Sequence, residues 1–434
     1  MLGAAHIRIT QSRFAYNYAR TATALWSSDA ASISIDGATF LGVSAPFPGS
    51  ALALFRPLLV NVSSSVFVCD ADSSGVVFIE SSGRIVLSNV SVTNCSFGDS
   101  SFSISSIHDM DIAISGLVAV SSDLSVRGPV SALSVTQSRL TNSTIFLSLD
   151  DSVVDLLALK PSNFEVASSQ FEDSAIRVTE LLQGRPARRA WRRTCYFTLR
   201  DSTFRALSPD APTMVSLSSL ILRVSVTNVL FSSAATATPL SVVALVFAAS
   251  VQNCTFANVG GIRLATENSS AAVLINSRFS GTNGVLTATA CQFVHVEDVT
   301  VTGAFGTSAI NVSIAEQATI LRVSLANSDF TNSALSMTSV RRLFVSNIRL
   351  SDSFSGRMAS MIKLDDIGGL DFIDVAVRNC TFALGAIHVG AGVRLVGSWR
   401  NVSLLDNFAT VGGGAMWVAK PALVPNLTLA VASG

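Results

Sequence analysis

The chain has 434 residues, and 29 Lys and Arg balance 29 Asp and Glu, which excludes a strong global field for attracting nucleic acid or acidic membranes. Charged residues make up 13% and hydrophobic residues 49%, which excludes intrinsic disorder because so much apolar surface must collapse. The longest strictly apolar run, residues 242–249, is far shorter than the roughly 20 residues of a membrane-spanning helix. No transmembrane segment is therefore predicted.

The N-terminal residues 1–8 lack a basic segment followed by an apolar stretch, so no secretory signal peptide is predicted there. Both ends of the chain cut through repeat units. We therefore expect the sequence to be a fragment of a longer protein.

One phrase recurs along the chain: alternating apolar residues, an Asn or similar turn residue, a small residue, one variable position and Phe. It is clearest in residues 90–97, 251–256 and 375–382, and looser copies end at Phe204 and Phe279. Equivalent positions from Phe14 to Phe408 number about 16 and lie about 26 residues apart on average, which indicates stacked repeat units.

Short strands are predicted in chain order, for example at residues 33–35, 112–114, 224–226 and 343–345, because these segments are β-branched or aromatic and end at Gly, Asn, Asp or Ser. No run of about 10–12 residues has the apolar spacing of a helix. We predict an all-β right-handed parallel β-helix (β-solenoid) of about 16 coils, essentially without helix, as a single domain over residues 1–434.

Stacked coils place similar side chains above one another. The recurring Phe positions therefore predict an aromatic core, and the recurring Asn positions predict a hydrogen-bonded ladder. The predicted core aromatics are Phe97, Phe171, Phe204, Phe256, Phe279, Phe330, Phe382 and Phe408. The predicted ladder of amides, turned inward so that each bonds the next coil, is Asn94, Asn253, Asn276, Asn327 and Asn379.

These Asn-Cys/Ser-x-Phe coils resemble the right-handed parallel β-helix proteins of the pectin-lyase-like superfamily. Residues 407–417 resemble the Asn-Phe and Gly-Gly-Ala units of surface adhesins on that fold, and the Asn-Cys-Thr-Phe style resembles the dispersed gene family surface proteins of kinetoplastids. The resemblance implies a non-enzymatic cell-surface or extracellular protein for adhesion or surface display. Its partners would be glycans or proteins of a host or neighbouring cell, and not nucleic acid.

The same resemblance leaves open a polysaccharide lyase or glycoside hydrolase, because that scaffold also carries such enzymes. The candidate acidic clusters are Asp365, Asp366, Asp371 and Asp374, then Asp150, Asp151 and Asp155, and finally His108, Asp109 and Asp111. None reproduces the ordered motifs of the superfamily's hydrolases, and we interpret them as turn residues. The four His residues are scattered, and Gly412–Gly414 lacks a following Lys-Ser, so no metal, cofactor or phosphate loop is predicted.

Six cysteines are present, at positions 69, 95, 195, 254, 291 and 380. Cys95, Cys254 and Cys380 occupy the small position that Ser holds in other units. Those three units lie several coils apart, beyond the roughly 7 Å that a disulfide spans between Cα atoms. We interpret the cysteines as buried thiols, some of them free or paired with absent parts of a longer protein.

An Arg-rich segment, residues 183–194, stands out in the charge pattern. It is predicted to be a solvated loop leaving the coil. Two other interpretations are a protease-cleavage loop and a contact with an anionic glycan or lipid head group. The glycan contact would use Arg188, Arg189, Trp191, Arg192 and Arg193.

Ten Asn-x-Ser/Thr sequons are present, which suggests a glycoprotein if the chain enters a secretory pathway. The predicted acceptors are Asn61, Asn89, Asn142, Asn268, Asn311, Asn401 and Asn426. Asn94, Asn253 and Asn379 are predicted not to be glycosylated, because an inward ladder amide would be inaccessible.

Overall fold

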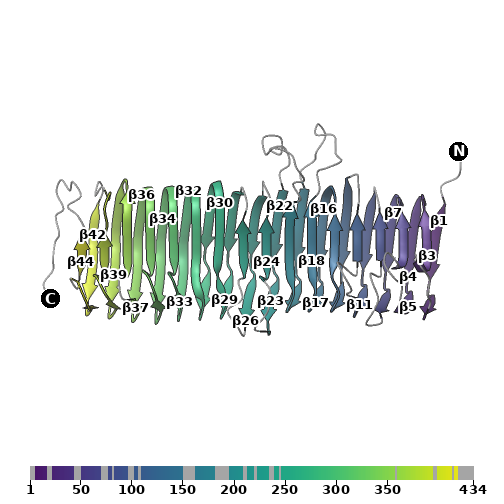
Figure 1. The fold of residues 1–434 in the computed structure, drawn as a ribbon, viewed down its shortest axis with the longest axis horizontal. Helices are drawn as coiled ribbons and strands as arrows, with labels where there is room; N and C mark the ends of the chain where they lie inside the picture. The colour runs from purple at the N-terminus through teal and green to yellow at the C-terminus, as the bar shows by residue number, and fades with distance from the viewer. Residues whose placement is uncertain are drawn as a thin grey trace. The chain divides into compact units, whose positions relative to one another are not determined.

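The chain folds as a parallel β-solenoid, which confirms the predicted fold class (Figure 1). The computed structural model describes residues 5–16, 22–43, 50–69, 77–80, 83–95, 102–105, 109–149, 162–180, 195–208, 213–218, 222–233, 239–243, 246–356, 359–393, 398–412 and 415–418. Within these ranges there is no helix, and the solenoid has about 13 turns, slightly fewer than the 16 expected.

Contacts group the chain into two units, Met1–Ser225 and Val226–Gly434, and each is built from parallel strands, which are short in the first unit and reach 20 residues in the second. The predicted single domain over residues 1–434 stays a prediction. The strands of the first unit are β1 (His6–Thr10), β2 (Arg13–Ala15), β3 (Ala22–Ser28), β4 (Ser32–Asp36), β5 (Thr39–Val43), β6 (Ser50–Phe55), β7 (Leu59–Ser63), β8 (Val66–Cys69), β9 (Val77–Glu80), β10 (Arg84–Ser88), β11 (Ser91–Thr93), β12 (Phe102–Ser105), β13 (Met110–Ser115), β14 (Val118–Val120), β15 (Leu124–Arg127), β16 (Val130–Thr136), β17 (Arg139–Thr141), β18 (Thr144–Leu149), β19 (Ser162–Ala167), β20 (Gln170–Glu172), β21 (Ala175–Glu180), β22 (Cys195–Arg200), β23 (Thr203–Ala206) and β24 (Val215–Ser218).

Strand β25 (Leu222–Thr227) contains the boundary between the units. The strands of the second unit are β26 (Leu230–Ser233), β27 (Leu240–Val243), β28 (Val246–Gln252), β29 (Thr255–Ala257), β30 (Gly260–Ile275), β31 (Arg278–Ser280), β32 (Asn283–Thr302), β33 (Phe305–Gly306), β34 (Ile310–Ala326), β35 (Asp329–Phe330), β36 (Leu335–Ser351), β37 (Phe354–Ser355), β38 (Ile362–Ile367), β39 (Leu370–Arg378), β40 (Thr381–Phe382), β41 (Ile387–Val389), β42 (Trp399–Leu405), β43 (Phe408–Ala409) and β44 (Met416–Val418).

Parallel pairing joins each strand to its equivalents one turn before and one turn after. Strand β10 pairs with β7 and β13, so that Ile85 lies opposite Val60 and Ile112, and all three side chains are buried. Alternate residues of a strand point to opposite faces, so one set fills the interior and the other faces solvent. Like side chains therefore stack along the interior.

Aromatic rings form the clearest interior stacks. In the first unit the ring centroids of Phe171 and Phe204 lie 4.4 Å apart with an interplanar angle of 2°. In the second unit Phe231, Phe256 and Phe279 form a run with centroid separations of 5.1 and 4.4 Å. These distances follow the strand spacing of about 4.8 Å, because each ring sits on the next turn.

Two sharp corners recur in nearly every turn, five residues apart, and each corner residue has a positive φ. Asn89 and Asn94 form such a pair in the first unit, and Asn347 and Asp352 form one in the second. Asn, Asp and Gly dominate because they tolerate the left-handed conformation better than other residues. A short strand lies between the corners; β5, β11, β17 and β23 line one edge of Figure 1.

The recurring Asn-small-x-Phe phrase occurs at both corners, which corrects the assumption that its Phe residues form one column. Phe256 and Phe279 follow the first corner. Phe330 follows the second corner at Asn327, and Leu325 occupies the Phe279 column in that turn. The local form of the two corners is the same, so the phrase alone does not distinguish them. Phe330 and Phe382 are nevertheless buried.

Phe408 departs from its predicted place in the core, since its side chain is 64% exposed. The corner residue before it is Asp406, two positions earlier, whereas Phe382 lies three positions after its corner residue Asn379. One position fewer reverses the face on which a strand side chain lies. Phe97 lies outside the described residues, and Val92 is the residue opposite Phe67.

A ladder of buried serines, rather than asparagines, connects the turns at the small position after each corner. The Ser138 N–H donates to Ser169 Oγ at 3.1 Å, and the Ser169 N–H donates to Ser202 Oγ at 3.2 Å. Each hydroxyl donates in turn to a carbonyl two residues earlier, as Ser169 does to Ala167 O at 2.8 Å. The ladder thus satisfies backbone donors that the sharp corner leaves out of the sheet.

The predicted ladder asparagines are exposed, because the left-handed corner directs their side chains outward. Some of them still bond along the surface: Asn276 Nδ2 donates to Asn253 Oδ1 at 2.7 Å, and Asn379 Nδ2 donates to Asp352 Oδ1 at 2.7 Å. The predicted inward orientation of Asn94, Asn253 and Asn379 is therefore wrong. The reason given for their escaping glycosylation no longer holds.

Replacing Ser169 with alanine is expected to lower the free energy of unfolding by about 1–3 kcal/mol, because the buried N–H of Ser138 loses its acceptor. The matched control is the exposed Ser218 on β24, whose φ is not positive and whose change to alanine should cost less than about 0.5 kcal/mol. Urea denaturation followed by circular dichroism would measure both values. Equal losses in the two variants would contradict the ladder.

Candidate binding groove

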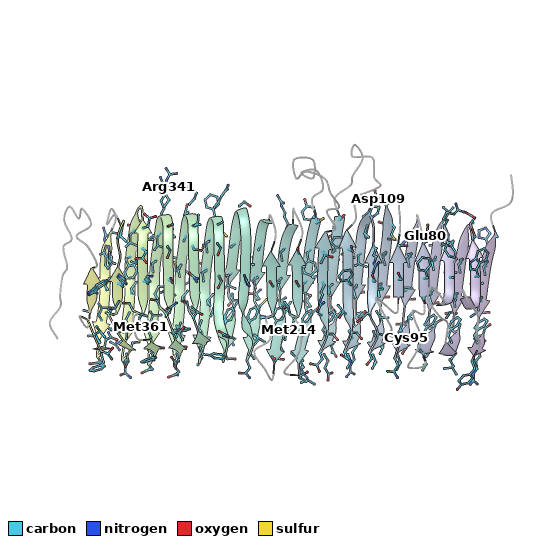
Figure 2. The ribbon with its side chains drawn as sticks, viewed as in Figure 1. Glu80, Cys95, Asp109, Met214, Arg341 and Met361 are labelled. Carbon is cyan, nitrogen blue, oxygen red and sulfur yellow. A yellow bond between two sulfur atoms is a disulfide. The ribbon has the colours of Figure 1, made fainter. Side chains whose placement is uncertain are left out.

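The most promising surface feature of the second unit is a groove on the outer face of β34, β36 and the loop before β39, with a volume of about 800 Å³. Its lining residues are Gln317, Thr319, Arg341, Arg342, Leu343, Phe344, Gly368, Gly369, Leu370 and Asp371. A second hollow of about 560 Å³ shares Arg341 and Gly368 with the groove and extends to Glu316, Ser339 and Asp366. Figure 2 shows Arg341 projecting away from the ribbon.

Strand alternation and register arrange the groove side chains as a small grid. On β36, Arg342 and Phe344 face outward on either side of buried Leu343. Gln317 lies opposite Arg342 and Thr319 lies opposite Phe344 on the preceding turn. Asp371 lies opposite Phe344 on the following turn. Thr319, Phe344 and Asp371 therefore form one row across three turns, beside Gln317 and Arg342 on the first two of them.

The groove is open beside Arg341 and Arg342 because the next turn carries Gly368 and Gly369 there. The Gly368 N–H donates to Val340 O at 2.9 Å, and the Leu343 N–H donates to Gly369 O at 2.8 Å. A Cβ at Gly368 would lie 2.6 Å from Arg341 O, so the close approach requires glycine. The glycine pair thus removes the side chains that would otherwise fill this part of the surface.

The carboxylates of the groove and of the adjoining hollow are held by contacts between turns. Asp371 Oδ1 accepts hydrogen bonds from the N–H and the hydroxyl of Ser398, at 2.8 and 3.0 Å. Asp366 accepts a hydrogen bond from the Ser339 hydroxyl at 3.1 Å. Glu316 pairs with Arg341 at 3.1 Å. These contacts fix the carboxylates in place as acceptors.

The rest of the predicted acidic cluster is engaged in the same manner. Lys363 pairs with Asp365 at 2.9 Å, and Asn401 Nδ2 donates to Asp374 Oδ1 at 2.8 Å. Asp111 is exposed, whereas Asp150, Asp151, Asp155 and His108 lie outside the described residues. Within the described ranges, no group of three or more His, Cys, Asp or Glu side chains is arranged to hold a metal ion.

A charged network lies on β34, which also lines the groove, and on the neighbouring strand β32. Arg322 contacts both Glu297 and Asp298, and His295 Nε2 lies 2.8 Å from Glu297 Oε2. The hydrogen bond from His295, reinforced by Arg322, lowers the pKa of Glu297, and Arg322 lowers the pKa of Asp298. Both carboxylates therefore remain ionised at neutral pH. Exposed pairs of this kind contribute little to stability.

The remaining described histidines have local contacts. His6 Nδ1 lies 2.7 Å from the Ser32 hydroxyl. His388 is half-buried against Trp417, with ring centroids 4.5 Å apart, and desolvation lowers its pKa. His6 lies on β1 in the first unit, and His388 lies on β41, two turns after the groove strand β36.

One disulfide joins Cys69 and Cys95, whose Cα atoms are 5.0 Å apart. This corrects the interpretation of both residues as thiols. Cys69 ends β8, and Cys95 follows β11, which pairs with β8 as the next turn. Cys69 and Cys95 occupy different positions of successive turns, so a comparison of cysteines at equal positions of the repeat cannot pair them.

The other four cysteines, at positions 195, 254, 291 and 380, are buried thiols. Desolvation raises the pKa of Cys254 to about 11 and raises the pKa of Cys380 in the same direction. Cys254 Sγ lies 3.2 Å from Gln252 O, in the geometry that a ladder serine uses. Cysteine thus substitutes for serine at the small position.

Several predicted contact and glycosylation residues fall outside the described structure. These are Asn426 and the Arg-rich segment with Arg188, Arg189, Trp191, Arg192 and Arg193, while the side chain of Asn268 is likewise not described. Among the other predicted acceptors, Asn89, Asn142 and Asn401 are exposed, and Asn61 and Asn311 are half-buried.

The residues of the groove and of the adjoining hollow were absent from the predicted sites, apart from Asp371 in the groove and Asp366 in the hollow. The alternation at residues 342–346 does predict that Arg342 and Phe344 share a face. It does not predict which turn lies beside them, because that depends on register. Gly368 and Gly369 indicate an open surface only once the register between turns places them next to Arg342.

No family model, no curated protein and no solved structure matches this chain. None of the described residues forms a helix with the length and apolar character to cross a membrane. The described chain is thus a parallel β-solenoid with an open groove on its second unit, and no family is assigned to it.

Proposed function

We propose that this chain is a non-enzymatic cell-surface or extracellular β-helix protein that serves adhesion or surface display through the groove. The observation that carries the proposal is that the carboxylates of the groove and of the adjoining hollow are held by contacts between turns, whereas Arg342 and Phe344 present a charged and an aromatic surface. Such a surface suits holding a ligand. The resemblance to pectin-lyase-like β-helices and kinetoplastid surface proteins supports the same proposal.

Two further features support exposure outside the cell. Disulfides such as Cys69–Cys95 persist in oxidising compartments and are rare in the cytosol. Several sequon asparagines stand at exposed corners, among them Asn89, Asn142 and Asn401. A surface of this kind accepts glycans without disturbing the interior.

A polysaccharide lyase or glycoside hydrolase is the second candidate, and one observation favours it. Asp366 and Asp371 lie in one turn and Glu316 lies two turns earlier, and the three share the two adjoining hollows with Arg341 and Arg342. Acidic and basic groups on one face are the minimum requirement for acid and base catalysis on a sugar.

The two candidates are separated by incubating the full chain with immobilised acidic and neutral polysaccharides. The adhesive function predicts retention without new reducing ends or unsaturated sugar products. An enzyme would release products, and Asp371→Asn would abolish their release while Asp329→Asn, at an exposed site on β35, would not. Product release that depends on Asp371 would therefore replace the proposed function with the enzymatic one.

A further inference from the structure

We propose that the second unit carries a self-complementary surface, through which two copies of this chain pair in antiparallel orientation. The surface is a row of phenylalanines, Phe305, Phe354 and Phe408, which are 37%, 43% and 64% exposed. The row lies after the second corner of each turn, whereas the groove lies before the first corner. The row is therefore separate from the groove and from the function proposed for it.

The three phenylalanines occupy one column of the solenoid, each of them two residues after the second corner of its turn. Asp329 lies between Phe305 and Phe354 in this column. Thr381 lies between Phe354 and Phe408. The strands β33 and β37, which carry the first two rings, follow the lower edge of Figure 1. An exposed ring thus recurs on every second turn, with a polar residue on the turn between.

The spacing of the rings leaves gaps that fit one further ring. Strands two turns apart are separated by about 9–10 Å, so a ring inserted midway would lie about 4.8 Å from each neighbour. The interior stack of Phe231, Phe256 and Phe279 has nearly this spacing, with ring centroids 5.1 and 4.4 Å apart. Aromatic pairs attract each other at such separations. The favoured occupant of each gap is therefore an aromatic side chain.

A second copy of the chain supplies aromatic side chains at the required intervals. From the first turn to the last, the column consists of Asn283, Phe305, Asp329, Phe354, Thr381 and Phe408. A two-fold axis across the middle of the column reverses this order in the second copy. Phe408 then faces Asn283 of the second copy, Phe305 faces Thr381, and Phe354 faces Asp329. Every ring enters a position that holds a polar residue in the other copy, and the contact is reciprocal.

The corner residues beside the row are compatible with this pairing. Asp352 would face Asn327 of the second copy, whose amide can donate to the carboxylate, and Asp406 would face Gly281. No carboxylate of these corners would face another. Asp329 is exposed and would face a ring, so its loss of hydration opposes pairing. Three rings from each copy form a small interface, and we expect a weak, concentration-dependent dimer.

Sedimentation equilibrium of the full chain, from about 2 to 200 µM, tests the pairing over the range expected for a small interface. The chain should pass from monomer to dimer within this range. Phe354→Ser should raise the dissociation constant of the dimer at least about 10-fold, because each copy loses a central ring. The matched control is Phe293→Ser, which changes a 51% exposed phenylalanine in the column of the groove residue Gln317. It should leave the dissociation constant within about 2-fold of the original value.

Thr381→Phe separates interleaved rings from a merely apolar patch. The added ring would fill the gap between Phe354 and Phe408, so it should weaken the dimer at least about 10-fold, although it adds apolar surface. Asp329→Ala should strengthen the dimer by about 3- to 10-fold, because it removes a carboxylate that pairing must dehydrate.

Three results of the sedimentation experiment would overturn the pairing: a chain that stays monomeric at every concentration, a stronger dimer in Thr381→Phe, or equal effects of the changes at Phe354 and Phe293. Retention on chitin beads is measured in parallel. A monomeric chain that the beads retain, and that Phe354→Ser releases, would assign the row to a flat polysaccharide and would equally overturn the second copy as its occupant.

Discussion

Replacing Phe256 with alanine is expected to lower the free energy of unfolding by about 3–5 kcal/mol. Its side chain is fully buried, and its ring stacks between Phe231 and Phe279 at centroid distances of 5.1 and 4.4 Å. Alanine would remove both ring contacts and leave a cavity. The neighbouring turns cannot collapse into that cavity, because their backbone bonds fix the distance between turns.

Urea denaturation of the full chain, followed by circular dichroism, measures this loss. Phe354 is the matched control, because it is also a phenylalanine of the second unit but is 43% exposed. Phe354→Ala should cost less than about 1 kcal/mol. A similar loss in both variants would show that the stacked rings do not carry the stability of the interior.

Removing the disulfide by the double change Cys69→Ser and Cys95→Ser is expected to cost about 2–4 kcal/mol. The two cysteines are 26 residues apart in sequence, and closing a loop of that size restricts the unfolded chain. Serine is the appropriate replacement at position 95, because Ser122 occupies the same position in the next turn and its hydroxyl accepts the Cys95 N–H at 3.1 Å. The double variant therefore keeps the ladder geometry and removes only the cross-link.

Melting curves of the double variant, and of the original chain with and without reductant, test this expectation. Reductant should shift the original chain to the melting temperature of the variant and leave the variant unchanged. Cys254→Ser provides a control, since Cys254 is a buried thiol in the ladder and the change should cost less than about 1.5 kcal/mol. A melting temperature that does not respond to reductant would contradict the disulfide.

The fold class could be predicted because each turn of a solenoid needs the same kinds of residue at the same positions. Alternating apolar residues, corner asparagines and a stacked aromatic recur often enough to reveal parallel strands. The two corners could not be separated from the sequence, because Asn253-Cys254-Thr255-Phe256 and Asn379-Cys380-Thr381-Phe382 have the same pattern and lie at different corners. Only the register between turns distinguishes them.

The binding groove depends on register even more strongly. Asp366 and Asp371 were predicted as part of an acidic cluster because their carboxylates are close together in the amino-acid sequence. Arg342 and Gly369 were not, because they lie 27 positions apart and meet only when one turn is placed on the next. The disulfide was missed for the same reason, since it joins residues at different positions of successive turns.

The five-residue interval between corners has a consequence for how the chain can change during evolution. Successive ladder serines are separated by 21 residues between Ser122 and Ser143 but by 33 between Ser169 and Ser202. The interval between corners is the same in both turns, so the additional residues of the longer one enter elsewhere, between β21 and β22. Insertions and deletions are therefore kept out of the segment between the corners, and a lineage can diversify the other connections while it inherits the interior unaltered.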